Sequence, residues 1–170
     1  MEVVVNDTNI LIDLFNAGLL PYCRMLNLEF RTLDVVINEI EVTEQQTAVQ
    51  HIIDEGTLSV YSLSSEQVAR VFQKVAEYHG ACNLSVEDIS VMVYAKDNGC
   101  RLLTGDKALR EKATLENVAV SGILYLTDML TREAVISNAE MVRALGRLLT
   151  TNNRLPKKLI KERIEALKHR

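Results

Sequence analysis

Four acidic residues occupy positions from which they could act together: Asp7, Glu39, Asp88 and Asp106. Asp7 directly follows the valine run at residues 3–5, which is typical of a buried strand, and Asp106 follows the apolar segment 102–104. In an open parallel α/β sheet, functional residues collect at the carboxyl ends of the strands. If these two strands are parallel, both carboxylates emerge at the same edge of the sheet.

The other two acids are placed at this edge by chain length. A helix from Asp88 to Gly99 rises about 16 Å at roughly 1.5 Å per residue. The strand from Cys100 to Asp106 returns over a similar distance at about 3.3 Å per residue. The spacing of 18 residues therefore brings Asp106 back to Asp88. Glu39 lies within two turns of the start of the helix expected after the second strand, again at this edge.

Four carboxylates packed together need a compensating charge, because like charges raise one another's pKa or repel the chain apart. A hard divalent cation resolves this conflict. Mg²⁺ or Mn²⁺ suits an all-carboxylate site that has no His or Cys ligand. Such an ion can activate water and stabilise in-line attack on a phosphodiester. The pattern therefore predicts a metal site with phosphodiesterase chemistry.

Each acid also has an ordinary structural explanation. Asp7 could simply cap the first helix. Asp88, with Glu87, could complement a helix dipole. Asp106, within the sequence Thr-Gly-Asp-Lys, could be a turn residue, and Glu39 could be a surface glutamate among others. The placement of all four at one edge supports the metal-site hypothesis more than any one of them does.

The elements expected to position these residues alternate between strands and helices. Apolar runs predict strands at residues 3–5, 28–33, 58–63, 100–104 and 118–120. Helical spacing and capping signals predict helices at residues 10–17, 35–54, 65–75, 86–98, 138–150 and from Pro156 onward. The helix at residues 35–54 is either continuous or interrupted near Thr43. The alternation favours an α/β fold, a three-layer sandwich with a central, mainly parallel sheet.

The length and composition fit a small folded unit. The chain has 170 residues, of which 48% are hydrophobic, enough to bury a core. We expect one domain at residues 1–130 and a C-terminal helical extension at 131–170 packed on the same domain. A net charge of −4 would by itself argue against a nucleic-acid partner. However, residues 154–170 carry +5 and the rest of the chain carries −9.

Composition also excludes several kinds of protein. No apolar run approaches the roughly 18 residues that would span a bilayer, and no signal peptide is evident, so we expect no membrane association. The three cysteines, Cys23, Cys82 and Cys100, and the three histidines show no zinc-site spacing, which favours a reduced, cytoplasmic protein. Aromatic residues make up only 5%, too few to favour base-stacking platforms of the OB or RRM kind.

The chain resembles a PIN domain, the metal-dependent nuclease module of VapC-type toxins and many RNA-processing enzymes. The matching segments are VVVNDTNILID, VINEI, LSVEDIS and CRLLTGDKALR, within residues 2–125. The resemblance implies that the four acids form the metal cluster, and that Asn9 and Thr104 support the site rather than bind the metal. It also implies a central parallel sheet and a homodimer. Asn6 departs from the family pattern, where an apolar residue is more usual.

These observations predict a Mg²⁺- or Mn²⁺-dependent endoribonuclease that cleaves single-stranded or looped RNA with metal-activated water, as a toxin-like component with an antitoxin-like protein partner. One alternative is a non-catalytic PIN-fold module that binds RNA or protein. Another is a different α/β enzyme, such as a phosphatase or receiver-type phosphoacceptor. The segment Asp7-Thr8-Asn9 lacks the second acid of a DxD nucleophile motif, and neither GxxxxGK[ST] nor GxGxxG occurs.

The C-terminal region is longer than a minimal toxin needs. Its basic segment, residues 154–170, could contact RNA phosphates or dock onto the acidic body of a second subunit. It could equally be an ordinary packing helix with a solvated basic face and an apolar face formed by Leu155, Leu159, Ile160, Ile164 and Leu167.

Overall fold

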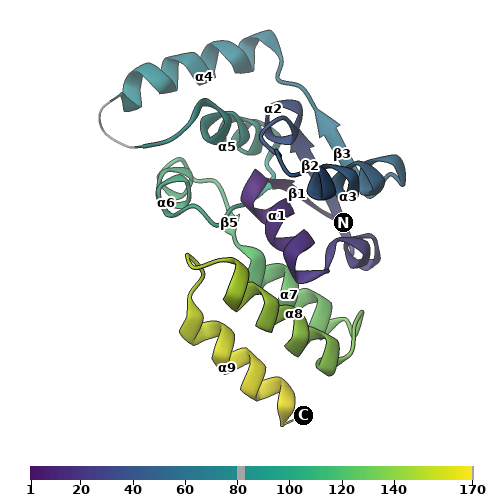
Figure 1. Cartoon of the computed structure of the whole chain (residues 1–170). Coiled ribbons are helices and arrows are strands. Elements are labelled where there is room, and N and C mark those ends of the chain that lie inside the picture. Colours follow the sequence, from purple (N-terminus) through teal and green to yellow (C-terminus); the bar gives the residue numbers. More distant parts are fainter. Residues whose placement is uncertain (80–82, 170) are drawn as a thin grey trace.

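A five-stranded parallel sheet forms the centre of the computed structural model, which describes residues 1–79 and 83–169 (Figure 1). The strand order is β3-β2-β1-β4-β5, and every neighbouring pair is parallel. The strands are β1 (Glu2–Asn6), β2 (Leu28–Leu33), β3 (Leu58–Tyr61), β4 (Arg101–Leu103) and β5 (Val120–Ser121). The predicted parallel α/β sandwich is thus confirmed.

Helices cover both faces of this sheet. On one face, α5 (Val86–Asn98) packs on β1 and β4, and α4 (Ser65–Tyr78) and α6 (Lys107–Leu115) pack on α5. On the other face, α1 (Thr8–Ala17) packs with α3 (Thr43–Asp54) and the short 3-10 segment η1 (Leu20–Met25). The remaining helices are α2 (Asp34–Ile37), α7 (Ile123–Arg132), α8 (Asn138–Thr151) and α9 (Lys157–Lys168).

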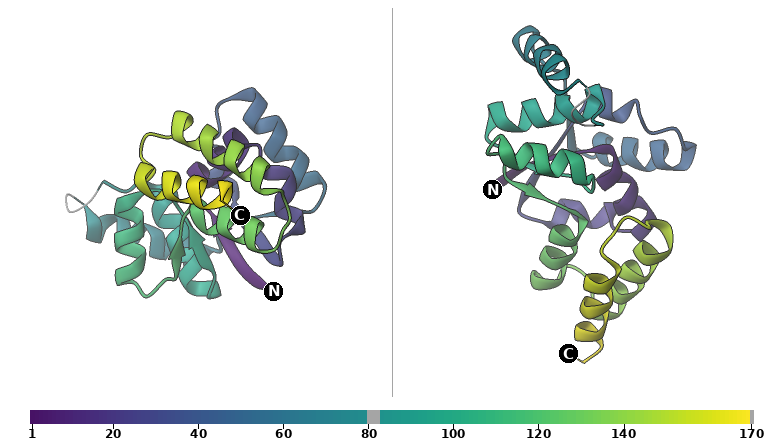
Figure 2. Two further views of the ribbon diagram at one scale, coloured as in Figure 1. Left: turned by 90° about the horizontal axis from the view of Figure 1, so that it is seen from below. Right: turned by 90° about the vertical axis from the view of Figure 1, so that its left-hand side faces the viewer.

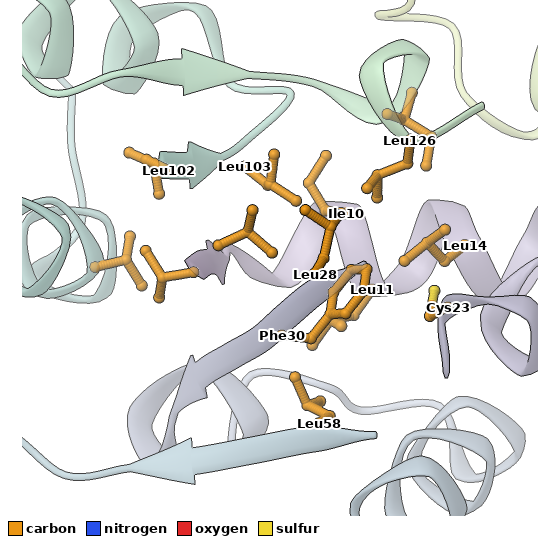
Figure 3. Packing of buried hydrophobic residues seen from close by; sticks show 14 of the residues in the cluster. Ile10, Leu11, Leu14, Cys23, Leu28, Phe30, Leu58, Leu102, Leu103 and Leu126 are labelled. Atoms are coloured by element: carbon orange, nitrogen blue, oxygen red, sulfur yellow. The ribbon is translucent and has the colours of Figure 1, made fainter. Parts of the chain in front are cut away.

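The core lies between the sheet and these helices. Val4 and Val5 in the central strand β1 are completely buried, as expected for a strand covered on both faces. Figure 3 shows Ile10, Leu11 and Leu14 of α1 packed close to residues of β2, β3 and β4. Each buried aliphatic side chain of this kind contributes about 1.5–3 kcal/mol relative to an exposed one. Burial of this apolar face therefore holds α1, and Asp7 at its start, against the sheet.

The predicted helix at residues 35–54 is divided, in agreement with the alternative of an interruption near Thr43. The helix α2 ends at Ile37, and α3 begins at Thr43. Between them Ile40 turns inward and is buried, and its carbonyl oxygen accepts a hydrogen bond from the Gln46 side chain at 2.6 Å. This side-chain bond replaces a helical backbone bond, so the chain can bend. As a result, Glu39 lies in the turn after α2.

Other boundaries differ from the expected ones. The third strand ends at Tyr61 rather than at residue 63, and the last strand comprises Val120–Ser121 rather than 118–120. Helices α6 and α7 and the segment η1 were not predicted. Pro156 occupies the N-cap of α9, one position before the first helical residue. The sequence predicts capping boxes at Ser64 and Ser137 and a helix cap at Ser85, and all three form; Ser85 also completes a capping box with Asp88.

The C-terminal helices extend the fold away from α4 (Figure 2). Helix α8 packs on α1, and α9 packs on α8. Ile160 of α9 is completely buried, and Arg163 binds both carboxylate oxygens of Asp128 in α7 at 2.7 Å. The apolar face of the basic segment 154–170 therefore packs against the protein, as expected for an ordinary packing helix, although Leu159 is 44% exposed.

Two further expectations concern cysteines and membranes. Cys23 and Cys100 are free thiols in buried positions, whereas Cys82 lies outside the described residues. Across residues 1–79 and 83–169, no helix is long and apolar enough to cross a membrane.

Candidate functional site

Asp7 lies at the carboxyl end of the central strand and begins helix α1. Its backbone N–H donates to the carbonyl oxygen of Leu103 at 3.0 Å, which joins the ends of β1 and β4. Its side chain caps α1 by accepting a hydrogen bond from the Thr8 N–H at 2.7 Å. Only 3% of Asp7 is exposed, which is unusual for a helix cap.

Thr104 and Asn9 connect Asp7 to the loop that carries Asp106. The Thr104 hydroxyl donates to Oδ2 of Asp7 at 2.7 Å and accepts from the backbone N–H of Asp106 at 3.0 Å. The Asn9 amide donates to the same Asp7 oxygen, and its carbonyl oxygen accepts from the Gly105 N–H at 2.7 Å. Both side chains thus contact the acid directly from the two sides of this edge.

Asp88 and Asp106 also take part in local helix capping. Oδ2 of Asp88 accepts from the Ser85 N–H at 2.9 Å within the capping box of α5. Oδ1 of Asp106 caps α6 by accepting from the Leu109 N–H at 2.8 Å. A local capping role therefore exists for three of the four acids: it was expected for Asp7, whereas Asp106 caps a helix rather than only forming a turn, and Asp88 belongs to a capping box. Capping alone does not require these residues to lie together.

Glu39 reaches the site from the turn after α2. Its carboxylate accepts a hydrogen bond from the hydroxyl of Thr8, the first residue of α1. Burial raises the pKa of Glu39, and the negative charges of Glu87 and Asp88 raise it further. The most exposed of the four acids is thus close to the start of both α1 and α5.

The four acids also affect one another's pKa values. Burial raises the pKa of Asp7 to about 6, and the charges of Asp88 and Glu39 add to this effect, while the hydrogen bond from Thr104 opposes it. Burial is also the main cause of the raised pKa of Asp88, to which Asp106 contributes. Asp88 therefore interacts with each of the other three acids.

The donor set at this edge suits a hard divalent cation, since it consists of carboxylates alone. The side chains do not form a finished coordination sphere: among the described residues, no group of three or more His, Cys, Asp or Glu side chains is arranged to hold a metal ion. Both oxygens of Asp7 are hydrogen-bonded to protein donors. The four acids are thus grouped, and each accepts a hydrogen bond from a protein donor.

Several contributors were not identified as site residues from the sequence. Glu87 adds a fifth negative charge near Glu39 and Asp88. Its place directly before Asp88 in the sequence could have identified it. Thr8 binds Glu39 across 31 residues of sequence, for which no local signal exists. Asn6 is completely buried, and its Oδ1 has no hydrogen-bond partner among the described residues, whereas its amide donates to the Arg31 carbonyl oxygen at 3.0 Å.

Known proteins share this fold. One similar structure is VapBC2 from Rickettsia felis bound to a DNA fragment from its promoter. The TM-score is 0.52 and the sequence identity is 13%, and the match covers 71% of this chain and 98% of that chain. PAE2754 from Pyrobaculum aerophilum gives a TM-score of 0.53 and 20% identity over 80% of this chain and 98% of that one. A search of curated proteins found no significant match.

These structural similarities show the fold. A family model described as "DUF3368: PIN domain" matches residues 3–169, which includes the acidic edge and the C-terminal helices. Since this match covers nearly the whole chain, the chain belongs to the PIN-domain family.

Proposed function

We propose that this protein is a divalent-metal-dependent endoribonuclease that cleaves single-stranded or looped RNA. PIN domains are typically nucleases and generally use divalent metals. In this proposal Asp7, Glu39, Asp88 and Asp106 hold Mg²⁺ or Mn²⁺. The ion, when bound, would supply Lewis-acid activation of water and stabilise the negative charge on the reacting phosphate.

The observation that carries the proposal is the buried, electrostatically unfavourable position of Asp7. A carboxylate whose pKa is raised to about 6 by burial and by two acidic neighbours is costly to ionise at neutral pH. A helix cap alone needs neither burial nor acidic neighbours. A bound cation would reverse the sign of the local field and favour the ionised form.

The protein's own groups have defined supporting roles. Thr104 and Asn9 fix the orientation of Asp7 through direct hydrogen bonds. Thr8 holds Glu39 near the start of α1. Because these donors are neutral, they orient the carboxylates without neutralising them, so the charge stays available for a cation.

The biological setting belongs to the same proposal. We propose a toxin-like component, held by an antitoxin-like protein and acting as a homodimer in the cytoplasm, in keeping with the family resemblance. The free thiols of Cys23 and Cys100 support a reducing compartment. The similarity to VapBC2 supports this setting through fold alone.

A non-catalytic PIN-fold module that binds RNA or protein is the alternative. It is favoured by the local capping roles of Asp7, Asp88 and Asp106, and by the lack of a ready set of metal ligands in the described part of the chain. The two proposals differ in whether a divalent ion is needed for an RNA strand to be cut.

A cleavage assay on labelled single-stranded RNA separates them. We expect cleavage with Mg²⁺ or Mn²⁺, none with EDTA, and loss of activity in D7N and D106N. Asn is as good a helix cap as Asp, so both variants keep their caps while losing the charge. Glu66→Gln, an exposed acid in the first turn of α4, is the matched control and keeps full activity. Undiminished cleavage by D7N would overturn the assignment.

A further inference from the structure

A small cavity lies beside the acidic edge, between α1 and the connection from α8 to α9. Its volume is about 200 Å³, and its lining includes Asn9 and Asn16 of α1, Gly105, and Thr151, Asn152 and Arg154 of the C-terminal connection. No aromatic ring lines it among the described residues. The Asn16 amide and the Arg154 guanidinium make no side-chain hydrogen bond to the described residues, and such donors suit a sugar–phosphate unit rather than a stacked base.

The cavity is continuous with the acidic edge through shared residues. Asn9 lines the cavity and also donates to the Asp7 carboxylate. Gly105, which also lines the cavity, donates its N–H to the side-chain carbonyl oxygen of Asn9 and lies between Thr104 and Asp106. A strand whose phosphate reached the four acids would therefore have its neighbouring nucleotide at this cavity.

The wall formed by the C-terminal connection is held in a fixed position. The Asn152 amide donates to both carboxylate oxygens of Asp13, at 2.9 and 3.0 Å, and its Oδ1 accepts from the Arg154 N–H at 2.9 Å. Leu155, the next residue, is buried. One turn earlier in α8, Arg147 donates to the Ala17 carbonyl oxygen at the end of α1. The backbone of Arg154 is thus anchored at both sides.

The Arg154 side chain is a cation placed at this wall without a carboxylate partner. It is exposed, and no acidic oxygen of the described residues lies within 4.0 Å of its guanidinium. Asp13 also lines the cavity, but it is only 3% exposed and both of its oxygens accept from Asn152. The accessible charge at this cavity is therefore positive, next to an edge that is otherwise acidic.

We propose that this cavity is a substrate subsite that binds the sugar–phosphate unit of the RNA strand next to the cleaved bond. Arg154 contacts the phosphate, for which a guanidinium offers paired donors. The amide of Asn16, which lines the same cavity, is the polar group that would meet the ribose hydroxyls, because the Asn152 amide and the Thr151 hydroxyl already donate to Asp13 and to the Arg147 carbonyl oxygen. This inference rests on the proposed nuclease function and adds a role for the C-terminal extension: it completes the substrate site.

The test compares Arg154→Ala with Lys158→Ala, which removes the same charge from an exposed position in α9 outside the cavity. Binding of a short fluorescein-labelled single-stranded RNA is measured by anisotropy over a salt series, with Ca²⁺ replacing Mg²⁺ to limit cleavage. We expect R154A to weaken binding about tenfold. Its slope of log affinity against log salt should fall by about 0.7, as for one lost phosphate contact on a single strand. K158A should change neither quantity, and R154K should restore the slope.

Cleavage kinetics on the same RNA with Mg²⁺ complete the test. We expect R154A to raise KM about tenfold with kcat nearly unchanged, since the contact lies beside the reacting phosphate. If the wild type cleaves RNA while R154A and K158A behave alike, the subsite is wrong and the nuclease proposal stands; an acidic protein ligand for Arg154 would give this result. If R154A weakens binding but the wild type never cleaves, the subsite stands and the nuclease proposal fails. A wild type that neither binds nor cleaves overturns both.

Discussion

At the scale of single residues, Asp7 is a helix cap that is buried among other acids, a combination that is unusual for a carboxylate. As the N-cap of α1 it stabilises a helix, and a capping carboxylate is normally ionised and solvated. Its burial among other acids instead raises its pKa to about 6. The hydrogen bonds from Thr104 and from the Thr8 backbone lower the pKa of Asp7 only in part. In the metal-free protein, Asp7 therefore carries an unfavourable charge at neutral pH.

This charge makes the stability of the metal-free protein depend on pH. The pKa of Asp7 rises from 3.8 to about 6, so between these values the folded state keeps a proton that the unfolded chain has released. Stability therefore falls as pH rises through this window, by up to about 3 kcal/mol for this group. D7N stays neutral and lacks this dependence. The free energy of unfolding is measured in urea with EDTA at about pH 4 and about pH 7. Relative to the wild type, D7N should be more stable at pH 7 than it is at pH 4. A difference in unfolding free energy that stays constant with pH would show that Asp7 titrates alike in the folded and unfolded states.

Thr104 provides a second test, because one hydroxyl serves both Asp7 and the backbone of Asp106. Thr104→Val keeps the shape of the side chain and removes both hydrogen bonds at a completely buried position. We expect a loss of about 1–3 kcal/mol in unfolding free energy and about a 10–100-fold loss of cleavage. Thr104→Ser keeps the hydroxyl and serves as the control. If the Val and Ser variants cleave RNA equally well, Thr104 does not position the acid.

The positions of Asp7 and Asp106 could be predicted from the sequence because each follows a short apolar strand. Chain length placed Asp88 by the same logic. The contacts that hold the acids could not be predicted, since they join residues far apart in the chain. Thr8 meets Glu39 across 31 residues, and Asn9 meets Gly105 across 96. Counting residues along helices and strands places the backbone of each acid at an edge of the sheet. Which side chains donate hydrogen bonds to these acids depends on how the folded chain packs.

At the scale of elements, Glu116 connects the protruding helix α4 to the rest of the fold. Its carboxylate accepts hydrogen bonds from Lys74 and Tyr78 of α4 and from Lys96 of α5. These hydrogen bonds, of which the one from Lys74 has the largest effect, lower the pKa of Glu116 to about 2. One acidic side chain at the end of α6 thus links three helices on one face of the sheet.

Glu116→Gln should therefore weaken the attachment of α4. A lowered pKa means that this stabilisation is present above the ordinary value of 4.5 and is lost as pH falls toward 2. We expect a loss of about 1–2 kcal/mol at neutral pH, discounted for partial solvent screening. Glu111→Gln, in an exposed pair with Lys107 at 3.8 Å, should cost much less. Equal losses in the two variants would mean that Glu116 is an ordinary surface ion pair.

Elements with strong local signals were predicted and those without were missed. Capping boxes at Ser64 and Ser137 and the cap at Ser85 marked three helix starts correctly. Helix α6 has only Leu109 and Ala113 as buried residues, too few for a clear periodic pattern. The strand β5 has two residues, so it gave no clear boundary before α7. Tertiary packing, rather than local pattern, determines these elements.

At the scale of the whole molecule, α8 of the C-terminal extension packs on α1, the helix that Asp7 caps, and α9 packs on α8. The family match extends through them to residue 169. We propose that residues 131–170 fold as part of the same unit, with α9 held by Ile160 and by the ion pair of Arg163 with Asp128. The uneven charge of the sequence then has a structural counterpart: an acidic edge, with basic residues supplied by the extension.

Two neighbouring residues of α9 test this proposal. Ile160 is completely buried, whereas Leu159 is 44% exposed. We expect Ile160→Ala to lower the free energy of unfolding by about 2–4 kcal/mol, with one cooperative transition, and Leu159→Ala to lower it by less than about 1 kcal/mol. Equal effects, or a separate early transition for the C-terminal helices, would show that the extension is not part of the folding unit.

If the acidic edge is a divalent cation site, thermal unfolding with and without the ion will reveal it. An ion that binds only the folded state stabilises it by about 2.7 kcal/mol at one hundred times Kd, and each kcal/mol raises Tm by about 2–4 °C in a chain of this size. We therefore expect millimolar Mn²⁺ at neutral pH to raise the wild-type Tm by roughly 5–10 °C relative to EDTA, with little change for D106N, which keeps its helix cap. Identical wild-type melting curves in Mn²⁺ and EDTA would contradict a divalent cation site at this edge.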